Sequence, residues 1–281
     1  MALAFSVELR PATPGDVTSM AGVYARAFGY SSKLDQIVEA FQVYMELAER
    51  GRGGCIVAEH EGSVVATGCY ALYGGYAWIG AVAVEPRLQR RRIGTAVARR
   101  LLQLLYGRVP SIGLDATPAS EQLYRRLGFT PEYRTTAYLL PERPAALSGQ
   151  RLHVEELDTV PAWLRELDAE ATGGDRAALI EAWLRRGAKL LAVEGEGYAL
   201  VHRCRIGPLV ARSIDAALSL LAEAVARGGQ RLIAPAVNRE MLEALAMLGA
   251  RETHVCTRMR LGSPRPEKPE MIYAIHSYMK G

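Results

Sequence analysis

The first 140 residues alternate between helical and strand-like spacing of apolar positions. A short strand at Val7–Arg10 precedes helical patterns that run to about Phe28 and restart at Ser32. Thr13, Pro14 and Asp16 predict the start of the first helix, as N-cap, first helical residue and capping partner. The remaining elements are expected at Cys55–Glu59, Ser63–Leu72, Tyr76–Val84, from Ile93, Ser111–Asp115, Pro118–Leu127 and Glu132–Leu139. The three successive strands, separated by Gly-containing turns, predict an antiparallel meander.

The second half nearly repeats this order. Strands, helices and a final strand are expected at Leu152–Leu157, Val160–Ala171, Asp175–Arg186, Lys189–Glu194, Tyr198–Arg203, Ile214–Arg227, Arg231–Ala234, Asn238–Leu248 and Glu252–Leu261. Ile206-Gly207-Pro208 is interpreted as a loop, so one central strand would be missing or shortened. A diverged internal duplication explains the pattern. Prolines and few apolar residues predict a linker at 141–150 between domains 1–140 and 151–281.

Composition narrows the classes of function. With 49% hydrophobic and 23% charged residues, the chain is globular. It lacks an apolar stretch of about 18 residues, and Met1–Val7 lacks the basic flank of a leader, so we expect a cytoplasmic protein that is neither exported nor membrane-bound. The net charge of +4 is mild and dispersed, which argues against a nucleic-acid partner.

The four cysteines are far apart in the sequence and form no CxxC pair. We therefore expect small buried core residues in a reducing compartment, and no metal site. The basic residues are almost all arginine, which suits bidentate phosphate contacts; compositional bias explains the excess equally well.

The informative segment is Ala81–Ala96, where a strand enters a basic loop that opens a helix. Backbone N–H groups and the positive end of the helix dipole converge there, a geometry that binds phosphate. Gly94 would let a pyrophosphate approach the backbone. A solvated arginine run at the start of a surface helix would look similar.

This segment resembles the pyrophosphate loop of the GCN5-related N-acetyltransferase (GNAT) family, which reads Gln/Arg-x-x-Gly-x-Gly/Ala. Gln89 and Gly94 fall on the pattern, whereas the family's first glycine is Arg92 here. We expect the loop to tolerate Arg92 if its dihedrals are ordinary helical or extended ones. Leu9–Asp16 resembles the family's opening strand and helix start, and Leu123–Phe129 resembles its Leu-Tyr-x-x-x-Gly-Phe signature.

The resemblance implies an α+β fold, with a mixed, mostly antiparallel central sheet flanked by helices, followed by a second GNAT-like domain. It implies acetyl-CoA as co-substrate, with the pantetheine arm paired like a strand along Val82 and Val84. The expected cofactor-binding residues are Val82, Ala83, Val84, Gln89, Arg90, Arg91, Arg92, Gly94 and Thr95.

In such enzymes the tyrosine of the signature often protonates the departing CoA thiolate, which makes Tyr124 the candidate catalytic acid; packing at a helix end is the alternative. The sequence does not single out a general base. Glu59, His60, Glu85 and water are all alternatives for proton removal.

The second half lacks the loop, and it places Leu245 where Tyr124 stands. We therefore expect it to be inactive and to wall the acceptor side of the site. Asp175 and Arg176 are either substrate contacts or a helix N-cap and a surface ion pair. The leading function is acetyl transfer to a primary amine of a small molecule or peptide; the alternative is a non-catalytic acyl-CoA sensor. A cut near Pro144 is expected to leave a first domain that binds CoA.

Overall fold

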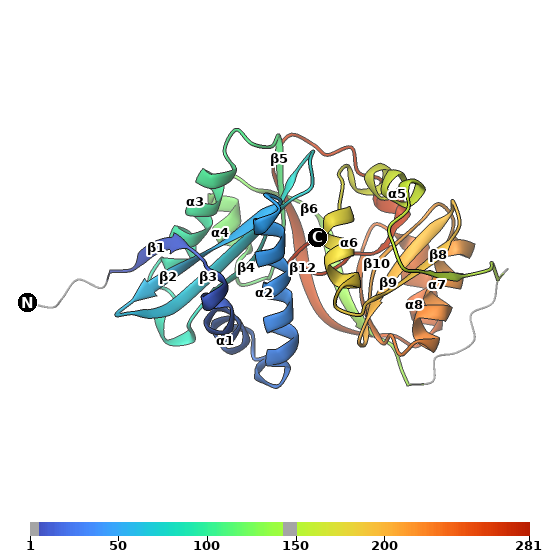
Figure 1. Cartoon of the computed structure of the whole chain (residues 1–281), viewed down its shortest axis with the longest axis horizontal. Helices are drawn as coiled ribbons and strands as arrows, with labels where there is room; N and C mark the ends of the chain where they lie inside the picture. Colours follow the sequence, from blue (N-terminus) through green and yellow to red (C-terminus); the bar gives the residue numbers. More distant parts are fainter. Residues whose placement is uncertain (1–5, 143–150) are drawn as a thin grey trace, which may run out of the picture. The chain divides into compact units, whose positions relative to one another are not determined.

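In the computed structural model, which describes residues 6–142 and 151–281, the chain forms two compact units. The first unit holds residues up to 72, residues 77–110 and Lys280. Its antiparallel strands have the order β1-β2-β3-β4; α1 and α2 lie on one face and α3 on the other (Figure 1). The elements are β1 (Glu8–Pro11), α1 (Val17–Phe28), α2 (Leu34–Glu49), β2 (Gly53–His60), β3 (Ser63–Leu72), β4 (Ala77–Val84) and α3 (Ile93–Leu105).

Two close contacts position helices of this unit, one at α3 and one at the start of α1. Gly68 on β3 leaves room for α3, because a Cβ there would come within 2.6 Å of Val97 Cγ1. At the start of α1, the Asp16 carboxylate accepts hydrogen bonds from the Thr13 N–H (2.8 Å) and from Arg10 (2.8 Å), as the capping pattern predicts. Arg10 thereby lowers the pKa of Asp16 far below its usual value. Pro14–Asp16 form a turn of 3-10 helix before α1 begins.

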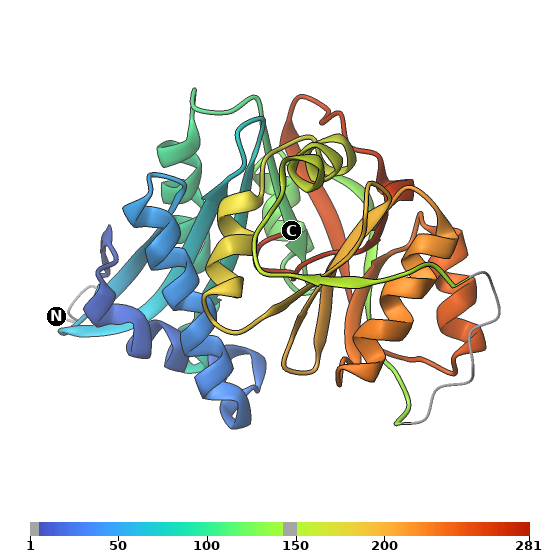
Figure 2. The same cartoon turned by 45° about the vertical axis from the view of Figure 1, so that its right-hand side comes forward.

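The second unit holds Tyr73–Tyr76, Ser111–Met279 and Gly281. Its strand order is β5-β12-β6-β11-β10-β9-β8-β7, and β13 pairs with β10. In Figure 2, α7 and α8 lie side by side on this sheet. The elements are β5 (Ser111–Ala116), α4 (Glu121–Arg126), β6 (Thr130–Leu139), β7 (Glu155–Leu157), α5 (Ala162–Thr172), α6 (Ala177–Leu184), β8 (Lys189–Val193), β9 (Gly197–His202), β10 (Arg205–Ala211), α7 (Ile214–Ala226), β11 (Arg231–Pro235), α8 (Arg239–Met247), β12 (Arg251–Gly262) and β13 (Ile272–Ala274).

The two sequence halves exchange their last strands. Strand β12, from the second half, lies between β5 and β6, and pairs with both. Strand β6, from the first half, lies in turn between β12 and β11. Each half therefore completes the sheet of the other, and the stretch Ser111–Leu139 belongs to the second compact unit.

The mixed, mostly antiparallel sheet with flanking helices confirms the predicted fold class. The interpretation of Ile206-Gly207-Pro208 as a loop was wrong, because these residues lie in β10. The central strand that was expected to be missing or shortened is present, with 7 residues against 8 in β4. Gly207 and Pro208 occupy a bulge, where the ladder with β9 is interrupted and proline costs no hydrogen bond. The units do not follow the division at 141–150, which remains a prediction about the sequence repeat; residues 143–150 of that linker lie outside the described ones.

The expectation that the cysteines are core residues kept reduced was wrong for one pair. Cys55 and Cys69 lie directly opposite each other on β2 and β3, with Cα atoms 4.0 Å apart, and form a disulfide. Cys256 is free and buried, and Cys204 is free and partly exposed. Among residues 6–142 and 151–281, no three acidic, histidine or cysteine side chains form a potential metal cluster. Within the same ranges, every helix is too short or too polar to span a bilayer.

Candidate active site

The loop between β4 and α3 is held by a small number of anchors. Pro86–Leu88 form a 3-10 turn after β4, and Leu88 is buried. The Gln89 side chain folds back, so that its Nε2 donates to the Val84 carbonyl (3.2 Å). Ile93, the first residue of α3, is also buried. The loop is therefore tethered at both ends, while Arg90, Arg91 and Arg92 between the anchors are exposed.

Two of the arginines adopt a left-handed backbone conformation. Arg90 and Arg92 both have a φ of 63°. Arg92 does not meet the condition of ordinary dihedrals under which its replacement of glycine would be unstrained: it keeps the conformation that a glycine would adopt, although it carries a side chain. Such strain is characteristic of functional loops.

The start of α3 is open to an anion. Its N-cap residue, Arg92, makes no side-chain capping bond. Within the described part of the chain, the N–H groups of Ile93, Gly94 and Thr95 donate no hydrogen bond, since the first intrahelical donor is Ala96. A Cβ on Gly94 would lie 3.4 Å from Val84, so a small side chain would be tolerated by the fold. Three free donors, a helix dipole and three arginines together fit a pyrophosphate.

Strand β4 carries a bulge beside this loop. Thr67 pairs with Ala83 and Cys69 with Gly80, so Ala81 and Val82 together face Gly68. Ala81 has a φ of 53°, and Val82 and Val84 are partly exposed. The bulge turns the strand locally and interrupts its ladder with β3. Val82 and Val84 are thus placed next to the loop, as the predicted pantetheine partners must be.

Tyr124 belongs to the second unit. It lies on α4, is 6% exposed and packs edge-on against Phe129, with ring centroids 5.7 Å apart. Burial raises the pKa of Tyr124 well above its ordinary value, so the phenol stays protonated at neutral pH. No described residue hydrogen-bonds to its hydroxyl. The side chain can therefore donate a proton, and no protein acceptor among the described residues competes for it.

The three open candidates for a general base are all engaged. Glu59 accepts from Arg10 (2.9 Å), His60 Nδ1 lies 2.8 Å from the Ser6 carbonyl oxygen, and Glu85 accepts from Arg26 (2.9 Å). No base is assigned.

In the second half, Asp175 and Arg176 make contacts within the fold. Asp168 and Arg176 form a buried ion pair of 2.6 Å, and Tyr198 donates to Asp168 (2.5 Å). Asp175 accepts from the Ala177 N–H (2.9 Å) at the start of α6. These contacts favour structural roles over substrate contacts: the ion pair is buried rather than on the surface, and Asp175 binds the start of α6 from the residue before its N-cap, Arg176. Leu245, in place of Tyr124, is fully buried.

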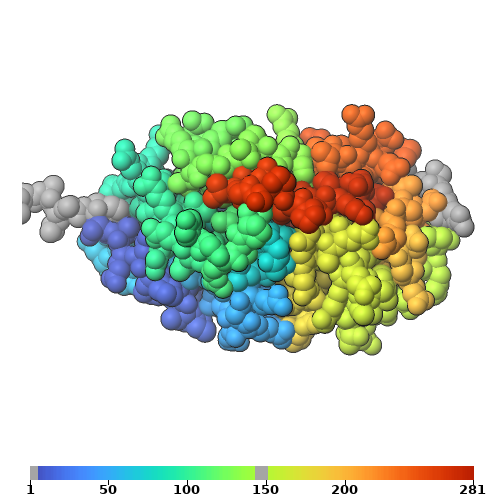
Figure 3. Space-filling model, turned by 90° about the horizontal axis from the view of Figure 1, so that it is seen from above, coloured from blue at the N-terminus to red at the C-terminus, as the bar shows by residue number. Residues whose placement is uncertain are grey.

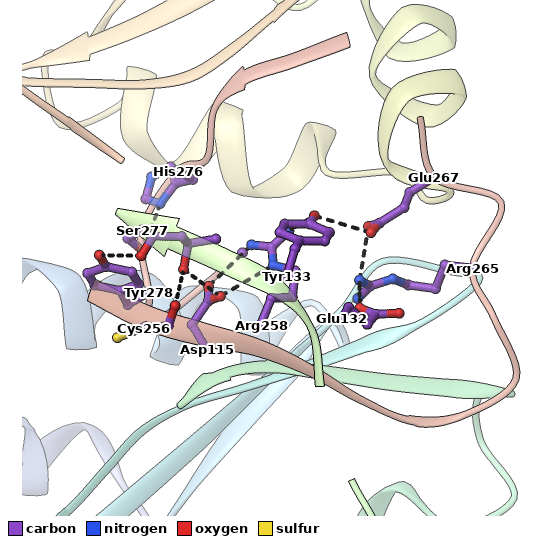
Figure 4. A network of polar contacts seen from close by, with 12 residues as sticks. Asp115, Glu132, Tyr133, Cys256, Arg258, Arg265, Glu267, His276, Ser277 and Tyr278 are labelled. Atoms are coloured by element: carbon purple, nitrogen blue, oxygen red, sulfur yellow. Dashed lines mark hydrogen bonds and ion pairs between the residues drawn. The ribbon is translucent and has the colours of Figure 1, made fainter. Parts of the chain in front are cut away.

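Sequence reasoning missed a polar network that holds the exchanged strands (Figure 4). Arg258 on β12 donates to Asp115 on β5 (3.2 Å) and to Tyr133 on β6 (3.1 Å); Tyr133 donates to Glu267, which pairs with Arg265. Figure 3 shows the red C-terminal segment lying along the green one that contains β5 and β6. The signal that could have pointed to it is Arg258 itself, which lies between Cys256 and Met259 in a predicted strand.

Comparisons with known proteins agree with this geometry. Residues 20–129 match the model of the acetyltransferase (GNAT) family, and residues 164–274 match that of an acetyltransferase (GNAT) domain. A crystal structure from Pyrococcus horikoshii, described as that of a putative acetyltransferase, is 38% identical, with a TM-score of 0.92, over 99% of this chain and 98% of that one. The chain belongs to the GCN5-related N-acetyltransferase family.

Two further similarities are more distant. A GCN5-related N-acetyltransferase from Anabaena variabilis shares the fold, with a TM-score of 0.60 and 17% identity over 91% of this chain and 72% of that one. The holothin acyltransferase of Pseudoalteromonas sp. (strain SANK 73390) is 28% identical over 187 residues, which are 61% of this chain and 62% of the relative. The match thus spans less than two thirds of that relative's length.

Proposed function

We propose that this GNAT protein transfers the acetyl group of acetyl-CoA to a primary amine of a small molecule or peptide, by direct attack. The observation that carries the proposal is the open start of α3, where three unbonded N–H groups lie beside exposed arginines. Val82 and Val84 are the backbone partners for pantetheine, and Gln89 shapes the loop through the Val84 carbonyl. The acyltransferase relative supports acyl transfer as the reaction.

In the proposed reaction, the amine nitrogen attacks the thioester carbonyl carbon, and the C–S bond breaks as the tetrahedral intermediate collapses. Tyr124 donates its phenolic proton to the departing sulfur, which leaves as the CoA thiol. The positively charged nitrogen of the intermediate loses one proton to water as the amide forms, and a proton from water restores the Tyr124 phenol. Because burial raises the pKa of Tyr124, its phenol is protonated at neutral pH, as the proposed step requires, but it is a weaker acid than an exposed tyrosine.

The test is release of free CoA thiol from acetyl-CoA across a panel of amines. Tyr124→Phe keeps the ring packed against Phe129 and is expected to lower kcat about 10²- to 10⁴-fold, with acetyl-CoA affinity little changed. Tyr106→Phe is the control, because that side chain is 90% exposed. A Tyr124→Phe enzyme that turns over at the parental rate, with chemistry rate-limiting, would make Tyr124 a packing residue.

The alternative is an acyl-CoA sensor without turnover. It requires the loop but not Tyr124, so CoA binding without thiol release from any amine would favour it. We also propose that the second half shapes the acceptor side. Cutting the chain near Pro144 does not test this cleanly, because β5 and β6 would lose β12 as their shared partner.

A further inference from the structure

Strands β10 and β11 of the second half form a fork. They run parallel, and their pairing is confined to Arg205 and Arg231 at the beginning of both strands. Further along, β10 pairs with β13 in place of β11, at Leu209 with Ala274 and Val210 with Ile272. The strands therefore separate toward their carboxyl ends, and β13 lies in the opening.

Strand β13 bridges the two arms of the fork. It runs antiparallel to β10, and the Ile275 N–H immediately after it donates to the Ile233 carbonyl of β11 (2.9 Å). Ile272, Tyr273, Ala274 and Ile275 are each at most 2% exposed. An extended segment of the chain thus fills the fork as an added strand.

Strand β10 of the fork corresponds in the second half to β4 in the first, because both strands carry the same kind of bulge. On β4, Ala81 and Val82 face one residue of β3; on β10, Gly207 and Pro208 face one residue of β9. The first residue of each bulge has a positive φ, 53° at Ala81 and 141° at Gly207. Aligned on the bulges, Leu209 and Val210 correspond to Ala83 and Val84.

Two residues, Gly207 and Asn238, position β13 in the fork. A Cβ on Gly207 would lie 2.4 Å from the Ile275 carbonyl oxygen, so only glycine permits this approach. Asn238, which is 3% exposed, donates from Nδ2 to the carbonyls of Glu270 and Ile272 (3.1 Å each), while its Oδ1 caps α8 at the Met241 N–H.

The neighbouring helix start differs as well, because one of its N–H groups is capped. Helix α7 follows β10 as α3 follows β4, but Ser213 caps it by accepting from the Ala216 N–H (3.3 Å). The corresponding start of α3 carries no such cap. In the second half the edge of β10 is therefore covered by β13, and the helix that follows β10 is capped by a side chain, unlike α3.

We infer that β13 takes the place of a pantetheine arm in the second half, so that this half is a permanently filled GNAT unit and the chain has one CoA site. The inference rests on the proposed function, because it compares the fork with the place where β4 would pair with the pantetheine arm of CoA. Its structural content, the pairing of β13 with β10 and its bond to β11 within the fork, stands separately.

Hydrogen exchange of the full chain, with and without CoA, tests the inference. Amides of residues 272–275 should be strongly protected without CoA and unchanged when it is added, whereas the start of α3 should gain protection. Rapid exchange of 272–275 without CoA, or protection of β10 and β13 that appears only with CoA, would overturn the inference. A start of α3 that ignores CoA would count against the proposed function alone.

Asn238→Asp makes the test selective. The carboxylate can still cap α8, but it cannot donate to the two carbonyls, so exchange of 272–275 should become at least about tenfold faster. Ser213→Ala, which also removes a cap contact but touches no residue of β13, should leave these amides unchanged. If the Asn238→Asp variant fails to fold, the exchange of the parent chain still decides the question.

Discussion

The left-handed arginines of the β4–α3 loop allow strain to be separated from charge. Arg90 and Arg92 have positive φ, whereas Arg91 between them does not. We consider each position replaced by alanine and by glycine. Both changes remove the guanidinium, so the difference between the two variants of one position reports the backbone alone.

The magnitudes follow from the dihedrals. An L-residue in the left-handed region costs roughly 1–2 kcal/mol, which glycine avoids. Elsewhere, glycine is less stable than alanine by roughly 0.5–1 kcal/mol. Glycine should therefore be the more stable variant at Arg90 and Arg92, by about 1 kcal/mol, and the less stable one at Arg91. For a chain of this size, about 1 kcal/mol corresponds to roughly 2 °C in Tm.

The assay is thermal unfolding of the six variants, followed by CoA titration. CoA affinity should fall from arginine to alanine at positions that contact phosphate and change little from alanine to glycine. The same sign of the glycine-minus-alanine difference at all three positions would refute the assignment of strain. If CoA affinity instead differs between the glycine and alanine variants but not between arginine and alanine, the flexibility of the loop, and not the charge of its arginines, governs CoA binding.

Three other predictions concern stability. The Cys55–Cys69 disulfide closes a loop with a sequence separation of 14, so replacing both cysteines by alanine should cost about 3 kcal/mol in urea unfolding; thiol titration of the denatured, unreduced parent should find two thiols. The lowered pKa of Asp16 contributes stability above pH ~4 that is lost as the pH falls, so the destabilisation in Asp16→Asn should shrink in acid; a pH-independent difference contradicts this. Arg258→Met leaves a buried carboxylate unpaired and should cost about 3–5 kcal/mol; a neutral effect contradicts the network.

Much of the fold could be predicted because apolar spacing and local contacts determine it. The Thr13–Asp16 cap and the meander depend on near neighbours, and both were found. Strand β10 was missed because Gly207-Pro208 normally ends a strand, and only the bulge opposite β9 accommodates it. The exchange of β6 and β12 leaves no local trace, since it depends on pairing between residues more than 100 positions apart.

The candidate site, too, could be predicted from the sequence only in part. Gln89, Gly94 and Tyr124 stand at motif positions, so the sequence alone could indicate them. The left-handed backbone of Arg92 and the bulge at Ala81 could not be predicted, because both conformations are unfavourable for those residue types and are imposed by surrounding structure. The Cys55–Cys69 disulfide depends on strand register, which spacing alone does not fix.

The most direct test of the central claim is calorimetric titration of the full chain with CoA, beside the Gly94→Glu and Gly94→Ala variants. The account predicts one CoA per chain for the parent, near-parental affinity for alanine, and strongly reduced affinity for glutamate, which brings bulk and a like charge to the open start of α3 while the fold is retained. Unchanged CoA affinity in a folded Gly94→Glu chain, or two CoA bound by the parent, would contradict it.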